Sequence, residues 1–545
     1  MFITPENWTY ERLKNDIEKG LLKIPQFQRD FVWSKEQSAR LIDSILKNYP
    51  INSFIIWETK ENLKYLRNIG NIDFPVTPED HFTSYVLDGQ QRITSIYAAL
   101  NGVKITRQDD KKEEDFSTIY IDLDSNEEDI VILDISTKEP FAYISLNELM
   151  ECDLVYIAQN YTPERIKKIQ KYRDAINNYP FSSIKLTQTN IEEATEIFTR
   201  LNVGGKKLSV FEIMVAKTFD KDCDFDLAEK YENLIEILKN ANYDTIPNST
   251  LLQSISVCLT NDCTKKTILN LNKQEFISIY DKVESALLDT IDYFKTKYRI
   301  PVSALLPYDG LVVPFTYFFY KTKGLKPTAT QAKYLEDYFW RVVISSRFYS
   351  SLEQRIGQDI NRINLILNEQ QPVYDEIIDI TPERIKHEGE FTTSKGYIKG
   401  LLCLLAYYQP KSFKDNSIVL IDNSWLKQAN SKNYHHFFPK AYMKKYRPDI
   451  PYSMVNHIAN ITIVDGYINK QEIRDKAPSK YMQKYISENE HISETMASHL
   501  IEIKQSNLIN DDFETFFNNR IELISQKLQE RIILTANDRC KSEKL

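Results

Sequence analysis

The middle of the chain carries apolar residues at three- and four-residue spacings, which is the pattern of amphipathic helices. One face of the last such segment is formed by Ile356, Ile360, Ile363 and Leu367. No internal repeat is evident. The pattern therefore predicts a helical middle region, with long helices over residues Lys221–Leu238, Lys273–Tyr298, Thr330–Leu352 and Gln354–Leu367.

Toward the N-terminal end, a short apolar strand runs directly into a helix. Tyr85, Val86 and Leu87 read as the strand, and apolar residues recur at helical spacing from Ile93 to Leu100. The polar string Asp-Gly-Gln-Gln-Arg, residues 88–92, lies between them. These five residues are therefore expected where the strand turns into the helix.

This junction has the chemistry of a phosphate site. Backbone amides at a helix N-terminus attract phosphate, and Gly89 lets the backbone turn and approach a ligand closely. The guanidinium of Arg92 can donate two hydrogen bonds to phosphate oxygens, while Gln90 and Gln91 add neutral donors. Asp88 could bind a metal ion or position a water. Taken alone, the string favours a nucleotide or phosphate site and a polar helix cap with a surface arginine equally.

Toward the C-terminal end, two short apolar runs flank a pair of histidines. The aromatic run Tyr434–Phe438 is strand-like and stops at Pro439, and Ile458–Val464 is a second run rich in Ile, Val and Thr. Gly466 supplies a turn, and Ile468–Arg474 reads as the start of a polar helix. This order predicts strand, loop, strand and helix, which brings the histidines beside the helix.

Four residues of this segment match the requirements of a one-metal nuclease. His436 is the candidate general base, because a histidine pKa lies near neutrality. His435 and Asn469 are the candidate ligands of a divalent metal, which neutralises charge on the phosphate and the leaving oxygen. Asn460 is expected to orient the base. The alternative is a pair of surface histidines in a chain rich in asparagine, and we interpret His457 as structural or incidental.

The C-terminal segment resembles the ββα-metal fold of HNH endonucleases. It has the paired histidines, the following proline, an asparagine that opens the second strand and an asparagine on the helix. The longer string NHIANITIVDGYINKQEIRDKAPSKY, after HHFFPK, looks like the HNH family at the C-terminus of GmrSD-type restriction enzymes.

Three N-terminal strings resemble the ParB/sulfiredoxin-like domain of the same proteins: IPQFQRDFVW, VLDGQQR and FTRLNVGGKKLS. Ser34 with Gln37, and Ser209 with Glu212, have the spacing of capping boxes at the helices that follow the first and third strings. The resemblance implies that Asp88, Gly89, Gln90, Gln91 and Arg92 bind and hydrolyse a nucleoside triphosphate. Gln28 and Arg29 are weaker candidates for this site, while Arg200 and Asn202 could equally be structural.

Both resemblances together are typical of single-chain GmrSD-like type IV restriction enzymes, including the BrxU and SspE types. We expect an α+β, largely helical fold, with a ParB/sulfiredoxin-like α/β N-terminal domain and a C-terminal ββα-metal HNH domain embedded in helices. The 545 residues are enough for two or three domains with their own cores. A polar, turn-prone stretch near residues 385–395 suggests one boundary. The predicted domains are residues 1–215, 216–390 and 391–545.

The net charge of −8 does not favour DNA binding by bulk electrostatics, so local basic patches are required. Two groups flank the histidines and Asn469, and the alternative for each is a solvated helix face. The first group is Lys440, Lys444, Lys445 and Arg447, and the second is Lys470, Arg474, Lys476 and Lys480.

The cysteines and the apolar runs indicate in which cellular compartment the protein is expected. Cys258 and Cys263 have no second ligand pair nearby, so they do not predict a zinc site. The residues after Met1 soon turn charged and do not read as a secretion signal. The apolar run near Gly310–Tyr320 has about half of the ~20 residues needed to cross a bilayer. We expect a cytoplasmic protein with reduced cysteines and no membrane partner.

The sequence thus predicts a nucleotide-regulated, divalent-metal-dependent DNA endonuclease that restricts modified phage DNA. The metal is Mg²⁺, Mn²⁺ or Ni²⁺, and the nucleotide is GTP, CTP, UTP or ATP. The expected partners are double-stranded DNA and the nucleotide, and a homodimer is left open. Two alternatives stay open: a nucleotide-gated DNA-binding or regulatory protein with weak or no nuclease activity, and an HNH nuclease acting on RNA.

Overall fold

The computed structural model divides into two compact units, Met1–Leu227 and Ala228–Leu545, each of which is described by itself. The predicted domain boundaries near 215 and 390 stay predictions. The side chains of residues 65–73, 192, 199 and 469–471 are not described. The structure describes residues 1–25, 31–60, 63, 65–66, 68–69, 72–73, 75, 77, 81–106, 113–125, 130–201, 209–220, 223–421, 434–464 and 468–540.

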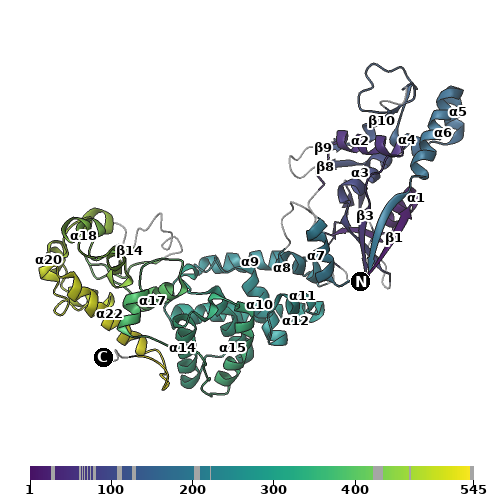
Figure 1. Ribbon diagram of the computed structural model, residues 1–545. Coiled ribbons are helices and arrows are strands. Elements are labelled where there is room, and N and C mark those ends of the chain that lie inside the picture. The colour runs from purple at the N-terminus through teal and green to yellow at the C-terminus, as the bar shows by residue number, and fades with distance from the viewer. Residues whose placement is uncertain are drawn as a thin grey trace. The chain divides into compact units, whose positions relative to one another are not determined.

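A mixed six-stranded sheet forms the centre of the first unit (Figure 1). Its order is β1-β13-β3-β7-β2-β4, with β13 parallel to β3 and β7 parallel to β2, while the other neighbours are antiparallel. Phe54, Ile56 and Val86 of the two inner strands are completely buried. The strands are β1 (Phe2–Trp8), β2 (Leu22–Pro25), β3 (Phe54–Thr59), β4 (Tyr65–Leu66), β7 (Thr83–Asp88) and β13 (Phe181–Thr187).

The helices of the first unit pack on this sheet and on each other. Helix α3 (Gln90–Asn101) is buried almost all round, between α2 (Lys35–Leu46) and α4 (Leu146–Glu151). The predicted capping boxes are confirmed at α2, by Ser34 and Gln37, and at α8 (Val210–Thr218), by Ser209 and Glu212. The remaining helices are α1 (Tyr10–Glu18), α5 (Leu154–Asn160), α6 (Pro163–Asn177), α7 (Ile191–Leu201) and the 3₁₀ turn η1 (Phe116–Thr118).

Three small sheets complete the first unit. The larger has the order β11-β10-β12 and is antiparallel, and the other two are two-stranded. Their strands are β5 (Asn68–Ile69), β6 (Ile72–Asp73), β8 (Lys104–Thr106), β9 (Glu113–Asp115), β10 (Tyr120–Asp122), β11 (Val131–Ile132) and β12 (Tyr143–Ser145).

A helical layer makes up the first part of the second unit. Its centre is α13 (Val312–Thr322), whose residues from Val312 to Phe319 are all buried and which packs against α10, α12 and α15. The helical middle that the spacing predicts is thus present. The other elements are α9 (Leu227–Asn240), α10 (Asn248–Thr260), α11 (Lys265–Asn270), α12 (Lys273–Thr296), η2 (Ser303–Leu305), η3 (Asp309–Leu311), α14 (Ala329–Ile344), η4 (Arg347–Tyr349), α15 (Leu352–Leu367), α16 (Pro382–Glu388) and α17 (Gly396–Tyr407).

The prediction of one helix over Thr330–Leu352 is wrong. Helix α14 ends at Ile344, and Ser346 and Ser351 adopt left-handed backbone angles with φ of 55° and 52°. The turn between them carries Arg347 inward, where its guanidinium pairs with the buried carboxylate of Asp359 at 3.0 Å. The bend thus places Arg347 beside this buried partner.

A β-hairpin surrounded by short helices forms the other part of the second unit (Figure 1). Strand β14 (Tyr434–His436) pairs antiparallel with β15 (Ile461–Ile463), so that His435 faces Thr462 and His436 faces Ile461. The surrounding elements are α18 (Lys440–Tyr446), α19 (Tyr452–Val455), η6 (Ile458–Asn460), the π-helical turn η7 (Ile468–Ile473), α20 (Pro478–Glu488), α21 (Ile492–Ser498), η8 (Leu508–Asn510) and α22 (Phe513–Gln529).

The segment after α22 returns to the helical layer. Helix α22 ends at Gln529, and the following segment turns back onto the helical layer. There the backbone of Arg539 exchanges hydrogen bonds with Ile378 and Ile380, and Asp538 pairs with Arg341 at 2.6 Å. These contacts are made by a non-helical segment that follows α22.

The α+β, largely helical fold is confirmed, whereas the ParB-like and HNH folds stay predictions. In the part of the chain that the structure describes, no helix is both long and apolar enough to span a bilayer.

Candidate active site

The hairpin brings both predicted histidines to one cavity. Neighbouring residues of a strand point to opposite faces, and His435 is 2% exposed whereas His436 is half-buried. His435 packs edge-on against the rings of Tyr481 and Phe413. Both nevertheless reach a cavity of about 620 Å³, which is lined by Phe391, Tyr434, His435, His436, Pro439, Lys440, Ala441, Tyr452, Asn456 and Arg474.

The ring of His436 is neutral at pH 7, but its pKa is lower than the near-neutral value that the sequence led us to expect of a general base. Burial and the nearby positive charge of Lys440 together lower the pKa of its imidazole to about 4, against a hydrogen bond with Asn456 that raises it. The ring is therefore neutral at pH 7 and can accept a proton. Its Nε2 lies 3.1 Å from Oδ1 of Asn456.

Asn460 acts on the turn that follows His436. Its side chain is completely buried, where Oδ1 accepts from the Phe438 amide at 2.8 Å and Nδ2 donates to the carbonyls of Phe438 and Val455. Its own carbonyl accepts from the Phe437 amide. The described contacts thus tie Asn460 to the two residues after His436, and any orienting effect on the base passes through this backbone.

Two site residues were missed by sequence reasoning. Asn456 contacts the His436 ring, and Phe391 lines the cavity with its ring edge-on to His436, the centroids 6.4 Å apart. Asn456 lies within the string that carries the HNH resemblance, but no role was assigned to it. Phe391 gives no sequence signal, because it lies 45 positions before His436.

The predicted metal ligands are only partly described. His435 lines the cavity, and an imidazole nitrogen suits Ni²⁺ and similar transition-metal ions. Asn469 lies in η7, directly after the hairpin, but its side chain is outside the described residues. Among the residues that the structure describes there is no cluster of three or more His, Cys, Asp or Glu side chains suited to a metal.

The predicted basic patches differ in what their members contact. Lys440 and Arg474 line the cavity, and Nζ of Lys440 bonds the Tyr452 hydroxyl at 3.0 Å. Arg447 is paired with Asp449 and Glu514, at 2.8 and 2.6 Å. The side chain of Lys470 lies outside the described residues, and the exposed lysines are Lys444, Lys445, Lys476 and Lys480.

His457 has a structural role. Its Nδ1 accepts from the Ala459 amide at 3.1 Å, and its Nε2 lies 3.0 Å from the Ile385 carbonyl. Both ring nitrogens are therefore used by the backbone, and burial lowers the pKa of this ring to about 4.

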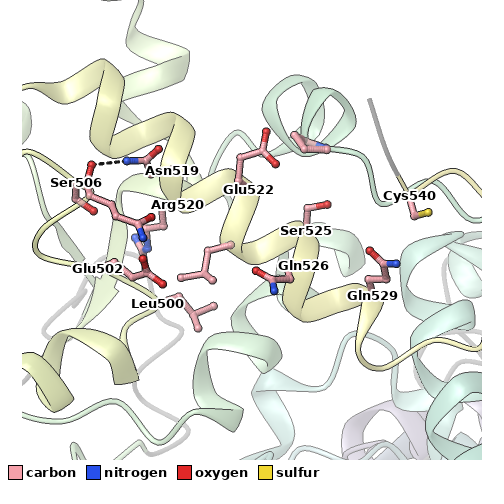
Figure 2. Close-up of a pocket in the computed structure, with 13 residues that line it drawn as sticks. Leu500, Glu502, Ser506, Asn519, Arg520, Glu522, Ser525, Gln526, Gln529 and Cys540 are labelled. Carbon is pink, nitrogen blue, oxygen red and sulfur yellow. Dashed lines mark hydrogen bonds between the residues drawn. The ribbon is translucent and has the colours of Figure 1, made fainter. Parts of the chain in front are cut away.

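A cavity of about 660 Å³ lies along α22, away from the histidines (Figure 2). Figure 2 shows Glu522, Gln526 and Gln529 along this helix and Cys540 on a separate segment. Arg520 links it to the hairpin region, because its Nη1 donates to the carbonyl of Ala459, next to Asn460. His435 and His436 line the cavity beside β14 and not this one.

The Asp88–Arg92 string lies where β7 runs into α3, as predicted. Gly89 has a φ of 97°, and a Cβ there would lie 2.5 Å from Cδ1 of Phe54, so only glycine fits. Arg92 pairs with Asp88 at 3.0 Å and donates to the carbonyls of Ile51 and Ser53. The structure thus shows Arg92 holding the loop before β3, and a role toward phosphate stays a prediction.

The two glutamines of the string differ in their contacts. Oε1 of Gln91 accepts from the Val32 amide at 3.0 Å. Gln90 is 5% exposed, and its Nε2 has no hydrogen-bond partner among the described residues. A buried donor without a partner is costly unless a ligand or water satisfies it. Gln28, Arg29 and Asn202 lie outside the described residues.

These features can be set against known proteins. Residues 10–219 match the family model described as the GmrSD restriction endonuclease, N-terminal domain, so this part of the chain is similar to that domain. The domain points to a restriction role in phage defence. The chain is also similar to Uncharacterized protein MJ0686 of Methanocaldococcus jannaschii, with 24% identity over 583 aligned positions, 94% of this chain and 96% of the relative. The similarity therefore spans both compact units.

Proposed function

We propose that the protein is a divalent-metal-dependent DNA endonuclease of phage defence whose cleavage is controlled by a nucleoside triphosphate. The observation that carries this proposal is the cavity beside β14, where a neutral histidine, a second histidine and two cationic residues line one space. The GmrSD-type domain supports foreign DNA as the target.

The cavity has the groups that phosphodiester hydrolysis requires. The reaction needs a base for the attacking water and positive charge around the phosphate. His436 is neutral at pH 7 and serves as the base. Lys440 and Arg474 line the same space and attract the phosphate backbone.

His435 and Asn469 are the residues that would hold the metal. An imidazole nitrogen and a carboxamide oxygen suit Mg²⁺, Mn²⁺ or Ni²⁺. When bound, such an ion supplies positive charge against the phosphate and the leaving oxygen. The position of His435, buried against aromatic rings at the cavity wall, supports this role.

The start of α3 is the proposed nucleotide site. A helix N-terminus attracts phosphate, Gly89 allows close approach of a ligand, and the buried Nε2 of Gln90 offers a donor. We assign GTP, CTP, UTP or ATP to Asp88–Arg92 as the regulating nucleotide, and modified double-stranded phage DNA as the substrate.

The test is DNA cleavage by the full-length protein and by a His436→Ala variant. Modified phage DNA and unmodified plasmid are incubated with Mg²⁺ or Mn²⁺, with and without each triphosphate. We expect cleavage of the modified DNA to fall at least about 100-fold in the variant, which lacks the base. A matched control is His491→Ala, because His491 is exposed and far from the hairpin in sequence.

Cleavage that persists in His436→Ala would overturn the assignment of the base. Absence of DNA cleavage under every condition, with triphosphate still hydrolysed, would favour the regulatory protein, and cleavage of RNA alone would favour the RNA nuclease. In the same assay, Asp88→Ala should abolish release of phosphate from the triphosphate, and unchanged release would refute the nucleotide site.

A further inference from the structure

The hydrogen bond between His436 and Asn456 determines which ring nitrogen can act as the base. Nε2 of His436 lies 3.1 Å from Oδ1 of Asn456. An amide can be turned so that either its oxygen or its NH₂ faces a neighbour, and a histidine ring can carry its proton on either nitrogen. The partner on the other side of Asn456 resolves both choices.

That partner is the backbone carbonyl of Phe391, 3.2 Å from Nδ2 of Asn456. A carbonyl oxygen can only accept, so the NH₂ group of Asn456 must face Phe391 and Oδ1 must face His436. An amide oxygen also can only accept, so Nε2 of His436 must carry the proton. Nδ1 is therefore left with its lone pair.

The Phe391 carbonyl is itself held firmly. The Phe391 amide donates to the Asn456 carbonyl at 2.8 Å, and the Ile458 amide donates to the Gly389 carbonyl at 2.8 Å. A Cβ on Gly389 would overlap the His457 ring and the Ile385 carbonyl, so the close approach of this segment depends on glycine. Asn456 also caps α19, where its amide donates to the Tyr452 carbonyl.

We propose that Asn456 is a positioning residue that holds His436 in the Nε2–H tautomer, so that Nδ1 takes the proton of the attacking water. The water O–H bond breaks, its proton goes to Nδ1, and the water oxygen bonds to phosphorus. The bond from phosphorus to the leaving oxygen breaks, and that oxygen keeps the electron pair and takes a proton from solvent. Nε2 keeps its proton throughout, and Oδ1 of Asn456 accepts a hydrogen bond from Nε2–H in both protonation states of the ring. This inference rests on the nuclease function proposed above.

The tautomer can be measured without any cleavage. In metal-free, full-length protein with ring-¹⁵N histidine, the two-bond ¹H–¹⁵N correlation spectrum distinguishes Nε2–H from Nδ1–H, and the signals lost in His436→Gln identify the ring. We expect His436 as Nε2–H in the unmodified protein. A proton on Nδ1 would overturn the inference, whether or not the protein is a nuclease.

Two substitutions test the cause. Asn456→Leu has a similar size and cannot accept, so the Nε2–H preference should be lost. Asn456→Asp keeps an acceptor and should retain it. The control is Asn510→Leu, which removes a surface hydrogen bond to Asn507 and should leave the His436 signals unchanged. An unchanged His436 spectrum in Asn456→Leu would refute the role of Asn456.

Cleavage then gives an independent measurement. We expect kcat of Asn456→Leu to fall at least about tenfold, because a base in the wrong tautomer loses activity steeply, with KM for DNA little changed. Asn456→Asp should recover most of that loss. If the unmodified protein cuts no DNA, the proposed function fails while the spectra still decide the role of Asn456. Equal losses of kcat in Asn456→Leu and Asn456→Asp would contradict positioning through the acceptor.

Discussion

Arg520 is a buried charge that supports the hairpin. It is 2% exposed, and its guanidinium donates to the carbonyls of Ala459 and His499, with no carboxylate partner among the described residues. Burial lowers the pKa of this guanidinium to about 9, which still leaves it charged at pH 7. The arginine therefore fixes the carbonyl next to Asn460, from a helix about 60 residues later in the sequence.

The Arg520→Lys variant tests whether the planar guanidinium of Arg520, and not only its charge, stabilises the protein. Lysine keeps the charge, but a single ammonium lacks the planar fork that reaches both carbonyls. We expect the free energy of unfolding in urea to fall by about 1–3 kcal/mol, the cost of a buried hydrogen-bonding group left unsatisfied. Arg299→Lys, at an exposed arginine of the same unit, is the control. Equal effects of the two changes would contradict the role of Arg520.

The residues of the candidate site were only partly predictable. His435 and His436 could be found because their type and the flanking apolar runs occur together in a short string, and the structure places both at one cavity. Asn456 could not be given its role, because that role depends on Phe391, a contact across 65 positions. The spacing of residues within one segment carries no information about contacts with a distant segment.

At the level of elements, the bend between α14 and α15 shows what hydrophobic spacing misses. Asp359 is completely buried, where it binds Arg347 and Arg362 and accepts from the Tyr338 hydroxyl at 2.9 Å. Because charged residues are usually exposed, a sequence pattern assigns Asp359, Arg347 and Arg362 to the surface. The spacing therefore predicted a continuous helix through Arg347, although it located α12 and α15 to within a few residues.

Removing the acid at the centre of this network should be costly. Asp359→Ala leaves Arg347 and Arg362 without their shared buried partner, and a broken buried ion pair costs about 3–5 kcal/mol. We expect a loss of that size in the free energy of unfolding measured in urea. The matched control is Asp281→Ala, since Asp281 is 79% exposed in its pair with Lys230 and should matter by less than about 1 kcal/mol. A loss near the control value would show that the network contributes little.

For the whole molecule, two buried histidines make stability depend on pH. Burial lowers the pKa of His457 to about 4 and that of His499 to about 3, whereas an unfolded histidine has a pKa of about 6.5. Between these values the unfolded chain binds more protons than the folded one. The contribution to stability is therefore complete above pH 6.5 and is lost as the pH falls toward 4.

From these two residues together, and apart from the contribution of His436, we expect the free energy of unfolding to be lower at pH 5 than at pH 7 by roughly 3–4 kcal/mol. His499→Gln, which keeps a donor for the Lys411 carbonyl, should remove about half of this difference. His491→Gln, at an exposed histidine, should leave it unchanged. A His499→Gln protein with the full pH dependence would show that His499 does not titrate as its burial requires.

The fold class could be predicted from the sequence, but the order in which the strands and helices pack could not. Apolar spacing and capping residues indicated the helices and the strand before α3, because these are local properties. The strand order of the N-terminal sheet was beyond reach, since β1 pairs with β13 across about 180 positions. The return of residues after Gln529 to the helical layer was missed for the same reason.

That return has a consequence for synthesis on the ribosome. Asp337 and Arg341 of α14 are buried against Ile533 and Asp538, and Asp337 accepts from the Ile533 amide while Arg341 donates to the Ile533 carbonyl. Until residues 533–538 have left the ribosome exit tunnel, the helical layer lacks the segment that covers its charges. A chain that ends before residue 533 would contain every residue that lines the histidine cavity but would lack these partners of Asp337 and Arg341.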